Sequence, residues 1–559
     1  MKFHLPLFEL AFVTAMVGLA LSKTATMEAA EQHESTHETS HETSHDAGQD
    51  YRTADRCATC HNNLKTAKGE DVSIGHEWGA SIMANAARDP YWQGSVRREV
   101  LEHPESSAAI QNECASCHMP LQNLQDKSQS RQTEMFKLLP LTTEHAEAAA
   151  AADGVSCTVC HQIQATGLGT PATYNGNFAV AGPDVHPRPV FGPYAADPDR
   201  VVKVHVMSAG YAPVQAGHMR DAGLCGSCHT LYTIARGADG KQIGQLPEQM
   251  TYLEWEHSDF RDKQTCQQCH MPAVEGPVLI ASLLGQPREG VRRHTFAGAN
   301  FLMEAMLGAH HDELGVTAEP AELAAATARV TAFLQTQSAH VNLGPAELSG
   351  SELSFPVRVE NLTGHKLPSA FPSRRAWLHV VVTAADGHMV FESGKLNPDG
   401  SIAGNANDAD AGSYSPHFNR ITKAEQVEIF EPILGDSQGH VTTGLLAATQ
   451  YLKDNRILPA GFDKKTAAHD IAVQGEAADD AAFTAGSSTT RYAISTNGAA
   501  GPFRITAELV FQPVGYRWAH NLASFQAAEP QRFVHYYEQA AAHSALVLAH
   551  GEITSGAGH

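Results

Sequence analysis

The sequence predicts an α+β multidomain fold: a mainly α, loop-rich region, then an antiparallel β-sandwich-like region and a C-terminal helix. Its 559 residues exceed the usual domain length of about 100–200 residues. The ten cysteines all lie between residues 57 and 269, where Gly, Pro and Asn interrupt nearly every segment. From residue 353 onward apolar residues recur with a period of two. These observations predict two regions of different construction.

Composition and charge narrow the class of protein. With 42% apolar and 18% charged residues, the chain is neither disordered nor collagen-like. Its 39 basic and 61 acidic residues give a net charge of −22. This balance argues against an electrostatic hold on nucleic acid or anionic lipid, so we expect no nucleic-acid partner.

The N-terminal segment predicts export. Residues 1–22 contain Lys2, an apolar run over residues 5–21 and the small-residue cleavage site Ala20-Leu21-Ser22. An uncleaved anchor is the alternative, because the run approaches membrane-spanning length, but Glu9 and the single basic flank favour cleavage. Either way we expect a periplasmic or extracellular protein whose membrane contact, if any, is through this segment alone.

Residues 23–50 form a His/Glu/Ser/Thr-rich linker. Histidine recurs every fourth position, at His33, His37, His41 and His45. In a helix these side chains would share one face and bind a transition metal. The segment has no apolar stripe to bury, so a disordered, solvated spacer is the favoured interpretation.

Cysteine usage determines the class. Random placement at this composition predicts about 0.01 Cys-x-x-Cys-His motifs. The chain has five, which contain all of its cysteines: Cys57-Ala-Thr-Cys60-His61, Cys114-Ala-Ser-Cys117-His118, Cys157-Thr-Val-Cys160-His161, Cys225-Gly-Ser-Cys228-His229 and Cys266-Gln-Gln-Cys269-His270.

The spacing has a chemical reason. Two thiols three positions apart add across both vinyl groups of one porphyrin, and the adjacent histidine then reaches the iron. A structural zinc ion needs four Cys or His ligands, usually from pairs of residues that converge on the metal. Five motifs that each end in histidine, with no cysteine left over, make zinc sites or disulfides improbable. The sequence predicts five covalently bound c-type haems with proximal ligands His61, His118, His161, His229 and His270.

The haem region, residues 51–315, has little protein for its cofactors. From Tyr51 to His310 the chain allows about 52 residues for each motif, too few for five separate haem domains. The haems must therefore supply much of the apolar core and lie close together. We expect short helices and long loops around an electron conduit.

The sixth iron ligands are harder to predict, because the region holds more histidines than five haems need. His218 and His257 lie seven and nine residues before Cys225 and Cys266, and His103 lies eleven before Cys114. Each is placed to fold back over its own or a neighbouring haem. His76 and His145 are weaker distal candidates.

These residues resemble a known family. The chain is similar to multihaem cytochromes c related to the tetrahaem carrier that accepts electrons from hydroxylamine oxidoreductase. The resemblance covers most of residues 51–310. Its segments are Glu77-Trp-Gly-Ala-Ser-Ile-Met-Ala-Asn-Ala-Ala-Arg-Asp-Pro-Tyr-Trp92, Cys114-x-x-Cys-His-Met-Pro120, Asp153-Gly-Val-Ser-Cys-Thr-Val-Cys-His-Gln162, Leu224-Cys-Gly-Ser-Cys-His-Thr-Leu-Tyr232, Tyr252-Leu-Glu-Trp-Glu-His-Ser258, Cys266-x-x-Cys-His-Met-Pro272 and Arg293-His-Thr-Phe296. It implies a mainly helical fold with closely packed haems.

The resemblance also implies distal ligands. Related cytochromes often use Trp-x-x-Ser-x-His; here Met83 takes the last position, which implies His/Met coordination, a ligand from elsewhere, or Met83 as core filler. The His294-Thr-Phe segment resembles a distal-ligand segment, so His294 is the strongest candidate. The loop Thr363-Gly-His-Lys-Leu-Pro368 resembles one that approaches a haem through its histidine, here His365, unless that residue is an ordinary turn histidine.

The second half of the chain predicts strands. Residues 316–341 read as a connector helix, residues 342–525 as the β-sandwich-like domain and residues 526–559 as a C-terminal helix and tail. Ala385-Asp386-Gly387 predicts one hairpin turn, and Asn497-Gly498 a second between strands near residues 492–495 and 503–511.

Two polar features of this half invite a functional interpretation. Asn405-x-Asn-Asp408-x-Asp410 is similar to a Ca²⁺ loop, but it lacks the glycine and the glutamate of an EF-hand. Arg374 and Arg375 either pair with haem propionates or lie at a solvated strand end.

Electron transfer to and from other redox proteins of the cell envelope is the favoured function, and a homo-oligomer is compatible with it. The alternative is an enzyme that acts on a small nitrogen or sulfur compound at one open-faced haem. All five motifs end in histidine, with no Cys-x-x-Cys-Lys of the pentahaem nitrite-reductase type, which favours a relay over an enzyme. A third interpretation is a subunit of an extracellular haem polymer, in which a partner chain supplies missing ligands.

Overall fold

The computed structural model describes residues 51–141, 148–182, 184–208 and 210–555. The predicted signal segment, the linker and His145 lie outside these residues. Within the described residues, no helix combines the length and the apolar character needed to cross a bilayer.

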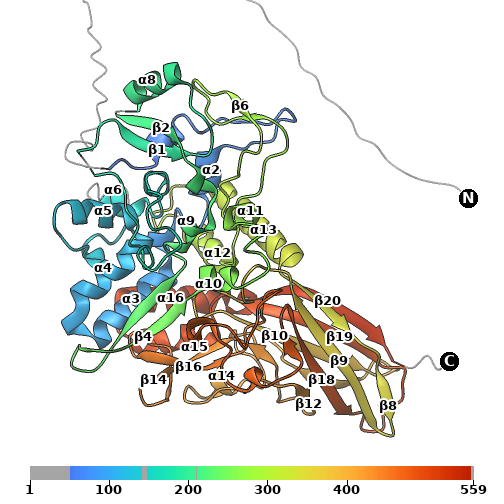
Figure 1. The fold of residues 1–559 in the computed structure, drawn as a ribbon. Coiled ribbons are helices and arrows are strands. Elements are labelled where there is room, and N and C mark those ends of the chain that lie inside the picture. Colours follow the sequence, from blue (N-terminus) through green and yellow to red (C-terminus); the bar gives the residue numbers. More distant parts are fainter. Residues whose placement is uncertain (1–50, 142–147, 183, 209, 556–559) are drawn as a thin grey trace, which may run out of the picture. The chain divides into compact units, whose positions relative to one another are not determined.

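The first half of the described chain is built from short helices joined by long loops (Figure 1). Its helices are α1 (Asp55–Ala58), α2 (Ile74–Gly79), α3 (Pro90–Glu102), α4 (Ser107–His118), α5 (Pro120–Ser128), α6 (Ala149–Ala152), α7 (Cys157–Cys160), α8 (Pro198–Met207), α9 (Ala222–Gly226), α10 (Thr251–Glu256), α11 (Cys266–His270) and α12 (Phe301–Ala309). Several begin at side-chain caps; for example, Asp89 accepts hydrogen bonds from two backbone N–H groups of the first turn of α3.

Three small two-stranded sheets also lie in this half, so it is not purely helical. They pair β1 (Arg188–Gly192) with β2 (Tyr211–Gln215), β3 (Leu231–Arg236) with β4 (Gln242–Gln249), and β5 (Val278–Leu279) with β6 (Pro287–Arg288). The helix α13 (Pro320–Gln337) then leads to the second half. It begins with proline in its first turn and a capping box formed by Glu319 and Glu322.

Two sheets form the β region. One has the strand order β11-β10-β19-β20, with β13 on β10, and the other β12-β18-β9-β7, with β8 on β9 and β17 on β18. The bounds are β7 (Ala339–Leu343), β8 (Glu347–Ser349), β9 (Glu352–Asn361), β10 (Arg375–Thr383), β11 (Met389–Ser393), β12 (Arg420–Ile421), β13 (Ile429–Phe430), β17 (Phe483–Thr484), β18 (Ser487–Ser495), β19 (Arg504–Gln512) and β20 (Leu546–Thr554). Every pair is antiparallel except β12 with β18.

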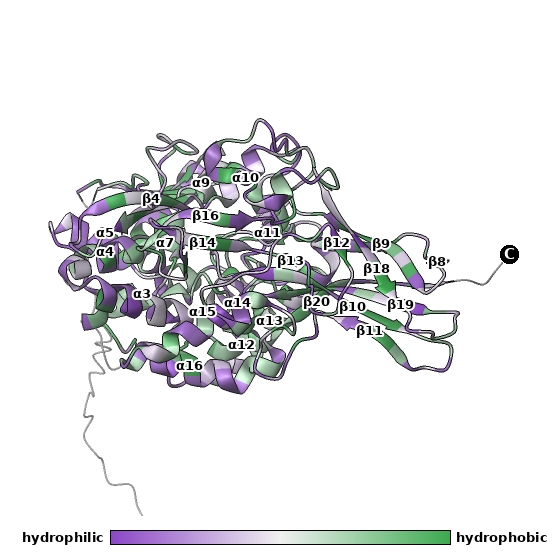
Figure 2. Cartoon of the chain, turned by 90° about the horizontal axis from the view of Figure 1, so that it is seen from below, coloured by the Kyte–Doolittle hydropathy of each residue, from purple (hydrophilic) through white to green (hydrophobic). Residues whose placement is uncertain are grey.

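The two sheets share one core. Buried side chains alternate along β9, as its sequence period predicts, and Figure 2 shows hydrophobic and hydrophilic segments along these strands. Phe355 on β9 stacks on Tyr492 on β18, with ring centres 5.3 Å apart. Phe391 on β11, in the other sheet, meets the edge of the same tyrosine at 6.1 Å. The side chains of the two sheets therefore interdigitate as in a sandwich.

The predicted hairpins have different outcomes. The first is confirmed, because β10 and β11 pair antiparallel across Ala385-Asp386-Gly387. The second is wrong: β18 pairs with β9, whereas β19 pairs with β10 and β20, so Asn497-Gly498 lies in a connection between sheets. A turn signal reports only a local reversal, and each of these strands finds its partner elsewhere in the chain.

The C-terminal segment also departs from expectation. The helix α16 (Ala528–Ala540) forms as predicted, but residues 546–554 are not a tail: they form β20, which adds an edge strand beside β19. The helix packs on α3 in the first half. Arg97 on α3 donates two hydrogen bonds of 2.8 Å to the Glu529 carboxylate on α16, which joins the first half of the described chain to the second.

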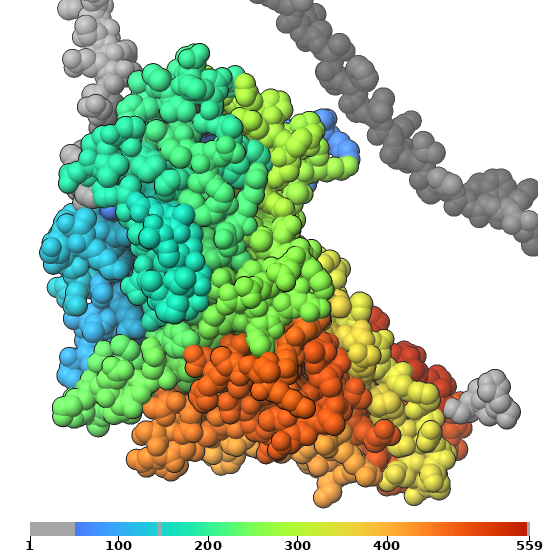
Figure 3. All heavy atoms as spheres, in the orientation of Figure 1, coloured from blue at the N-terminus to red at the C-terminus, as the bar shows by residue number. Residues whose placement is uncertain are grey.

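Besides the two sheets of the sandwich, the second half contains a smaller three-stranded sheet, which lies against the first half of the chain. It consists of β14 (Pro432–Asp436), β15 (Val441–Thr442) and β16 (Ala448–Asp454), and the helices α14 (Ala406–Ala409) and α15 (Tyr516–His520) complete the second half. The Tyr451 hydroxyl donates to the Pro247 carbonyl at 2.7 Å, so β16 lies beside β4. In Figure 3 the orange segment that contains β16 borders the green segment that contains β4.

Candidate functional site

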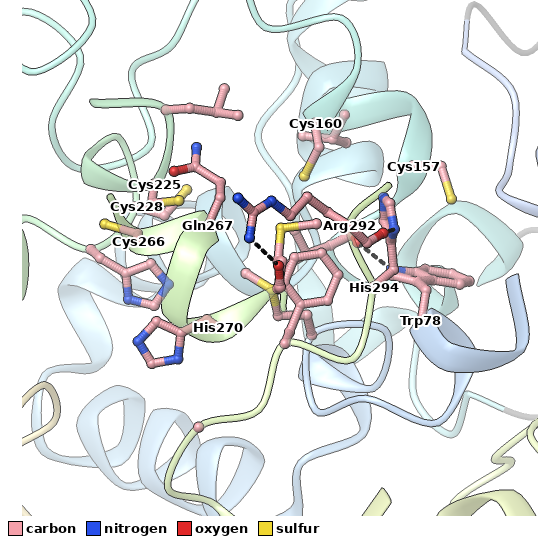
Figure 4. Close-up of a pocket in the computed structure, with 18 of the residues that line it drawn as sticks. Trp78, Cys157, Cys160, Cys225, Cys228, Cys266, Gln267, His270, Arg292 and His294 are labelled. Atoms are coloured by element: carbon pink, nitrogen blue, oxygen red, sulfur yellow. Dashed lines mark hydrogen bonds between the residues drawn. The ribbon is translucent and has the colours of Figure 1, made fainter. Parts of the chain in front are cut away.

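All five motifs line one continuous cavity. Its volume is about 1860 Å³, and all ten motif cysteines and all five motif histidines are among its lining residues. Figure 4 shows the part of this cavity where side chains of the third, fourth and fifth motifs converge. The chain thus brings motifs spread over more than 200 residues to a single apolar space, which suits several porphyrins packed against one another.

Short helical turns present the thiols. Cys157 and Cys160 begin and end α7, Cys266 and Cys269 lie in α11, and Cys114 and Cys117 lie in the last turns of α4. In a helix, positions three apart face the same side, so both thiols of a motif point to one porphyrin edge. Local capping explains these turns: α7 starts at the Ser156 cap, and α11 at a capping box.

Four proximal histidines share one hydrogen-bond pattern. In each, Nδ1–H donates to a backbone carbonyl oxygen, which leaves Nε2 as the nitrogen available to a metal. The pairs are His61 with Ile280 at 2.5 Å, His118 with Ala86 at 3.1 Å, His161 with Phe191 at 2.6 Å and His270 with Ala297 at 2.6 Å. His118 also stacks on Trp92, with ring centres 4.4 Å apart, which further restricts its ring.

His294 lies opposite the proximal histidine of the third motif. The ring centres of His161 and His294 are 6.3 Å apart, and the ring planes differ by 20°. Two imidazoles on opposite faces of one iron, each with a metal–nitrogen bond of about 2.0 Å and about 1.1 Å from nitrogen to ring centre, would give about 6.2 Å. His294 Nδ1–H donates to the Arg292 carbonyl at 3.0 Å, so its Nε2 is available.

His365 has the same relationship to the fifth motif. Its ring centre lies 6.4 Å from that of His270, with the planes 11° apart. Its Nδ1 bonds the Lys366 carbonyl at 2.9 Å, again leaving Nε2. His365 comes from the loop between β9 and β10, so the β region contributes to the cavity. Both histidines line the cavity, and burial lowers the pKa of each, to about 3 for His294.

The structure places the remaining candidates differently. Met83 lines the cavity, whereas His76, His103, His218 and His257 do not. His218 Nε2–H donates to the Ile163 carbonyl at 2.8 Å, and His257 Nε2–H donates to the Asp463 carbonyl at 3.1 Å. These contacts occupy the nitrogen that the proximal histidines leave available. His145 lies outside the described residues.

Thiols of different motifs contact each other. A hydrogen bond between Cys57 and Cys157 lowers the pKa of the first thiol and raises that of the second. The same relationship links Cys117 with Cys228, and Cys266 with Cys225. If each thiol attaches to a porphyrin edge, as the motifs predict, these contacts would place the edges of neighbouring haems close together. The contacts connect the first motif to the third, and the fourth to both the second and the fifth.

A half-buried arginine, Arg374, lines the cavity. Burial lowers the pKa of Arg374 to about 10. Its guanidinium donates to the Ser369 carbonyl at 2.9 Å and to Asn300 Oδ1 at 3.0 Å. Within the described residues no carboxylate lies at ion-pair distance from it. The charge of Asp89 partly offsets the effect of burial on Arg374, and the propionate groups of a haem would supply a further anion at hydrogen-bonding range.

Arg375 has a structural partner instead. It donates to Asp408 Oδ1 at 2.7 Å, and Asp408 Oδ2 accepts a hydrogen bond from the Ile402 backbone N–H at 2.8 Å. Asp408 belongs to the segment predicted as a Ca²⁺ loop. Its carboxylate is therefore committed to the fold, and no metal-binding group of three or more His, Cys, Asp or Glu side chains occurs in the described part of the chain. The structure gives the expectation of calcium no support.

Sequence reasoning did not find the buried ion pairs that hold the His365 loop. These ion pairs link side chains from distant segments of the chain: Lys366, Asp454, Arg456 and Glu254. Nothing in the local pattern around any one of these residues indicates its partners, although Lys366 lies inside the Thr363–Pro368 segment already singled out for His365.

Comparison with known proteins adds one similarity of fold. No family model matches the chain, and no curated protein does. A solved structure, the penta-heme cytochrome c552 from Thermochromatium tepidum, aligns with 90% of this chain and 99% of its own, at 15% identity and a TM-score of 0.48. The chain's own residues therefore carry the assignment of its cofactor.

Proposed function

We propose that the protein is a multihaem c-type cytochrome of the cell envelope that carries electrons through five closely spaced, covalently bound haems. One observation carries the proposal: the ten cysteines and five histidines of the motifs line a single cavity. Thiol contacts between motifs support a short spacing between neighbouring cofactors.

The chain's residues have three tasks in this function. The cysteines attach each cofactor, and the carbonyl partners of Nδ1 hold the proximal rings so that Nε2 faces the metal. His294 would hold an iron together with His161, and His365 would hold one together with His270. Bound haem would supply one-electron redox chemistry, and an iron held by two histidines would be low-spin and closed to substrate.

The contacts between motifs suggest the order of the relay. The first and third motifs form one contact, and the fourth contacts both the second and the fifth. The Cys160 charge also raises the pKa of Cys225 and of Cys228, although less than burial does, so the third motif lies near the fourth. We therefore propose that the fourth haem neighbours the second, third and fifth, and that the first haem neighbours the third.

Location and partners are part of the proposal. The apolar segment at residues 5–21 supports export, and haem is attached to Cys-x-x-Cys-His motifs in exported bacterial proteins. We propose a periplasmic or extracellular location and other redox proteins of the envelope as partners. A membrane anchor through residues 1–22 and self-association both stay open to test.

An oxidoreductase with an open-faced haem is the second candidate, and one observation favours it. Within the described residues, only His294 and His365 join the five proximal histidines in lining the cavity. Among the described residues that line the cavity, no further histidine would then serve as the second ligand of an iron held by His61, His118 or His229. Methionines also line the cavity, namely Met83, Met207, Met219, Met271 and Met303, and a methionine ligand would close a face that otherwise admits substrate.

Haem content and spin state test these proposals. The protein should be expressed with a working cytochrome maturation system, and haem per chain measured by mass and by haemochrome absorbance. Five haems that all accept electrons support the relay. A colourless protein, or one with fewer haems, overturns it. A high-spin iron that binds nitrite, hydroxylamine or CO in the isolated protein favours the enzyme, whereas an iron that becomes six-coordinate only on assembly favours a polymer subunit.

A further inference from the structure

A chain of buried charges lies behind the loop that carries His365. Lys366 Nζ is 2.6 Å from Asp454 Oδ2, and Arg456 holds the same carboxylate through two nitrogens, each at 2.8 Å. Arg456 Nη1 then lies 3.0 Å from Glu254 Oε1. The side chains of all four residues are at most 7% exposed.

Glu254 connects this chain of charges to the loop backbone. Its Oε2 accepts a hydrogen bond from the Lys366 backbone N–H at 3.1 Å and another from the Ser369 hydroxyl at 2.6 Å. The two donors lie one residue and four residues after His365. Glu254 belongs to α10, between the fourth and fifth motifs. One carboxylate of the haem region therefore holds this β-region loop at two points.

Close packing restrains the other side of His365. A side chain at Gly364 would approach Phe260 Cβ to 3.1 Å and Trp255 Cδ1 to 3.2 Å, so only glycine fits without a shift. The Ser258 hydroxyl donates to the Gly364 carbonyl at 3.1 Å. The segment from α10 through the following turn thus fixes the backbone before His365 as well as after it.

The energetic balance calls for a role other than stability. Removing a charged group from water costs several kcal/mol per ion, and well-packed apolar residues often stabilise a fold as well as a buried ion pair does. Two cations and two anions are buried here beside a candidate iron ligand. Directional, bidentate contacts of this kind fix a geometry more narrowly than apolar packing.

We propose that Glu254, Arg456, Asp454 and Lys366 are positioning residues that hold His365 at the axial position opposite His270. The inference rests on the proposed haem ligation and deepens it. The sixth ligand of the fifth haem is then supplied by the β region and held there by α10. A disturbance at the contact between these two regions would change the coordination of that haem.

The primary test is Glu254→Gln in the five-haem protein. The amide keeps one acceptor oxygen for the loop and loses the ion pair with Arg456. We expect partial loss of one low-spin signal in the electron paramagnetic resonance spectrum, a new high-spin signal, and recovery of the low-spin signal with added imidazole. Glu256→Gln is the matched control, because Glu256 lies in the same helix and, unlike Glu254, makes no hydrogen bond to the described residues of the loop.

A second pair of variants keeps the outcomes distinct. His365→Gly should convert one iron fully to high-spin; if it changes no signal, the proposed ligation itself is wrong. If His365→Gly acts and Glu254→Gln leaves every signal unchanged, the ligation stands and the positioning role is overturned. Should Glu254→Gln fail to mature, Ser369→Ala removes the 2.6 Å contact with Glu254, together with a 3.0 Å contact to the Thr251 hydroxyl, and should give a smaller high-spin fraction. An unchanged spectrum there contradicts the proposal.

Discussion

The imidazoles of His270 and His365 lie nearly parallel, with ring centres 6.4 Å apart and planes 11° apart. The first belongs to a helical Cys-x-x-Cys-His motif and the second to a loop of the β region. Each uses Nδ1 for a backbone carbonyl and keeps Nε2 available. This separation suits one iron between them, and it makes the β region part of the candidate site.

His294 is predicted to ligate the iron of the third motif. His294→Gly should remove one low-spin signal from the oxidised protein and add a high-spin signal, since the opposite face of the His161 iron then lacks its nitrogen. Added imidazole should reverse the change. His218→Gly is the control, because His218 lies outside the cavity lining. Equal effects of the two substitutions would contradict the assignment.

Arg374 is predicted to raise the potential of a nearby haem. Its half-buried positive charge favours the reduced iron, so Arg374→Gln should lower one midpoint potential on the order of 59 mV, a tenfold change for one electron. Arg374→Lys, which keeps the charge, should shift it less. A potentiometric titration followed by absorbance measures both. Unchanged potentials in Arg374→Gln would place the propionates elsewhere.

His417 is predicted to make stability depend on pH. Burial by itself lowers its pKa, but the charges of Glu428 at 2.6 Å and Asp480 at 3.0 Å outweigh burial and raise it. A raised folded-state pKa gives stability that is fully present below about 6.5, the ordinary histidine pKa, and is lost as pH rises through the folded value.

Thermal unfolding across this range checks the His417 prediction. The midpoint temperature of unfolding should fall as pH rises above about 6.5. The free energy of unfolding should fall by on the order of 1.4 kcal/mol for each unit by which folding raises the pKa of His417. His417→Gln should flatten this dependence. His440→Gln, at an exposed histidine beside Asp436, is the control. A wild-type curve that rises over the same interval would refute the sign.

The contact between α3 and α16 is predicted to stabilise the fold. Glu529→Gln removes a bidentate ion pair in which the Arg97 side chain is 24% exposed and the Glu529 side chain 11%. The loss should lower the free energy of unfolding by about 1–3 kcal/mol. Glu275→Gln, at an exposed pair with Lys68, should cost about 0–1 kcal/mol. Denaturant unfolding compares the two; similar losses would show that the α3–α16 pair has no special weight.

Sequence reasoning reached the fold class and many elements because these depend on local patterns. The two-residue period predicted β9 and β10, and a turn signal predicted the hairpin of β10 with β11. The same kind of signal failed at Asn497-Gly498, where the strands on either side join different sheets. No turn signal beside residues 546–554 indicated that they form a strand. They become β20 because they pair with the open edge of β19.

The same division applies to the candidate site. Each Cys-x-x-Cys-His motif is a local unit of two thiols and a histidine, and so the sequence by itself was enough to predict the cofactor and five attachment sites. Which distal histidine faces which iron depends on segments far apart in the chain. Only the tertiary structure decided that His294 meets His161 and His365 meets His270, because folding, and not spacing, brings those rings within one metal's reach.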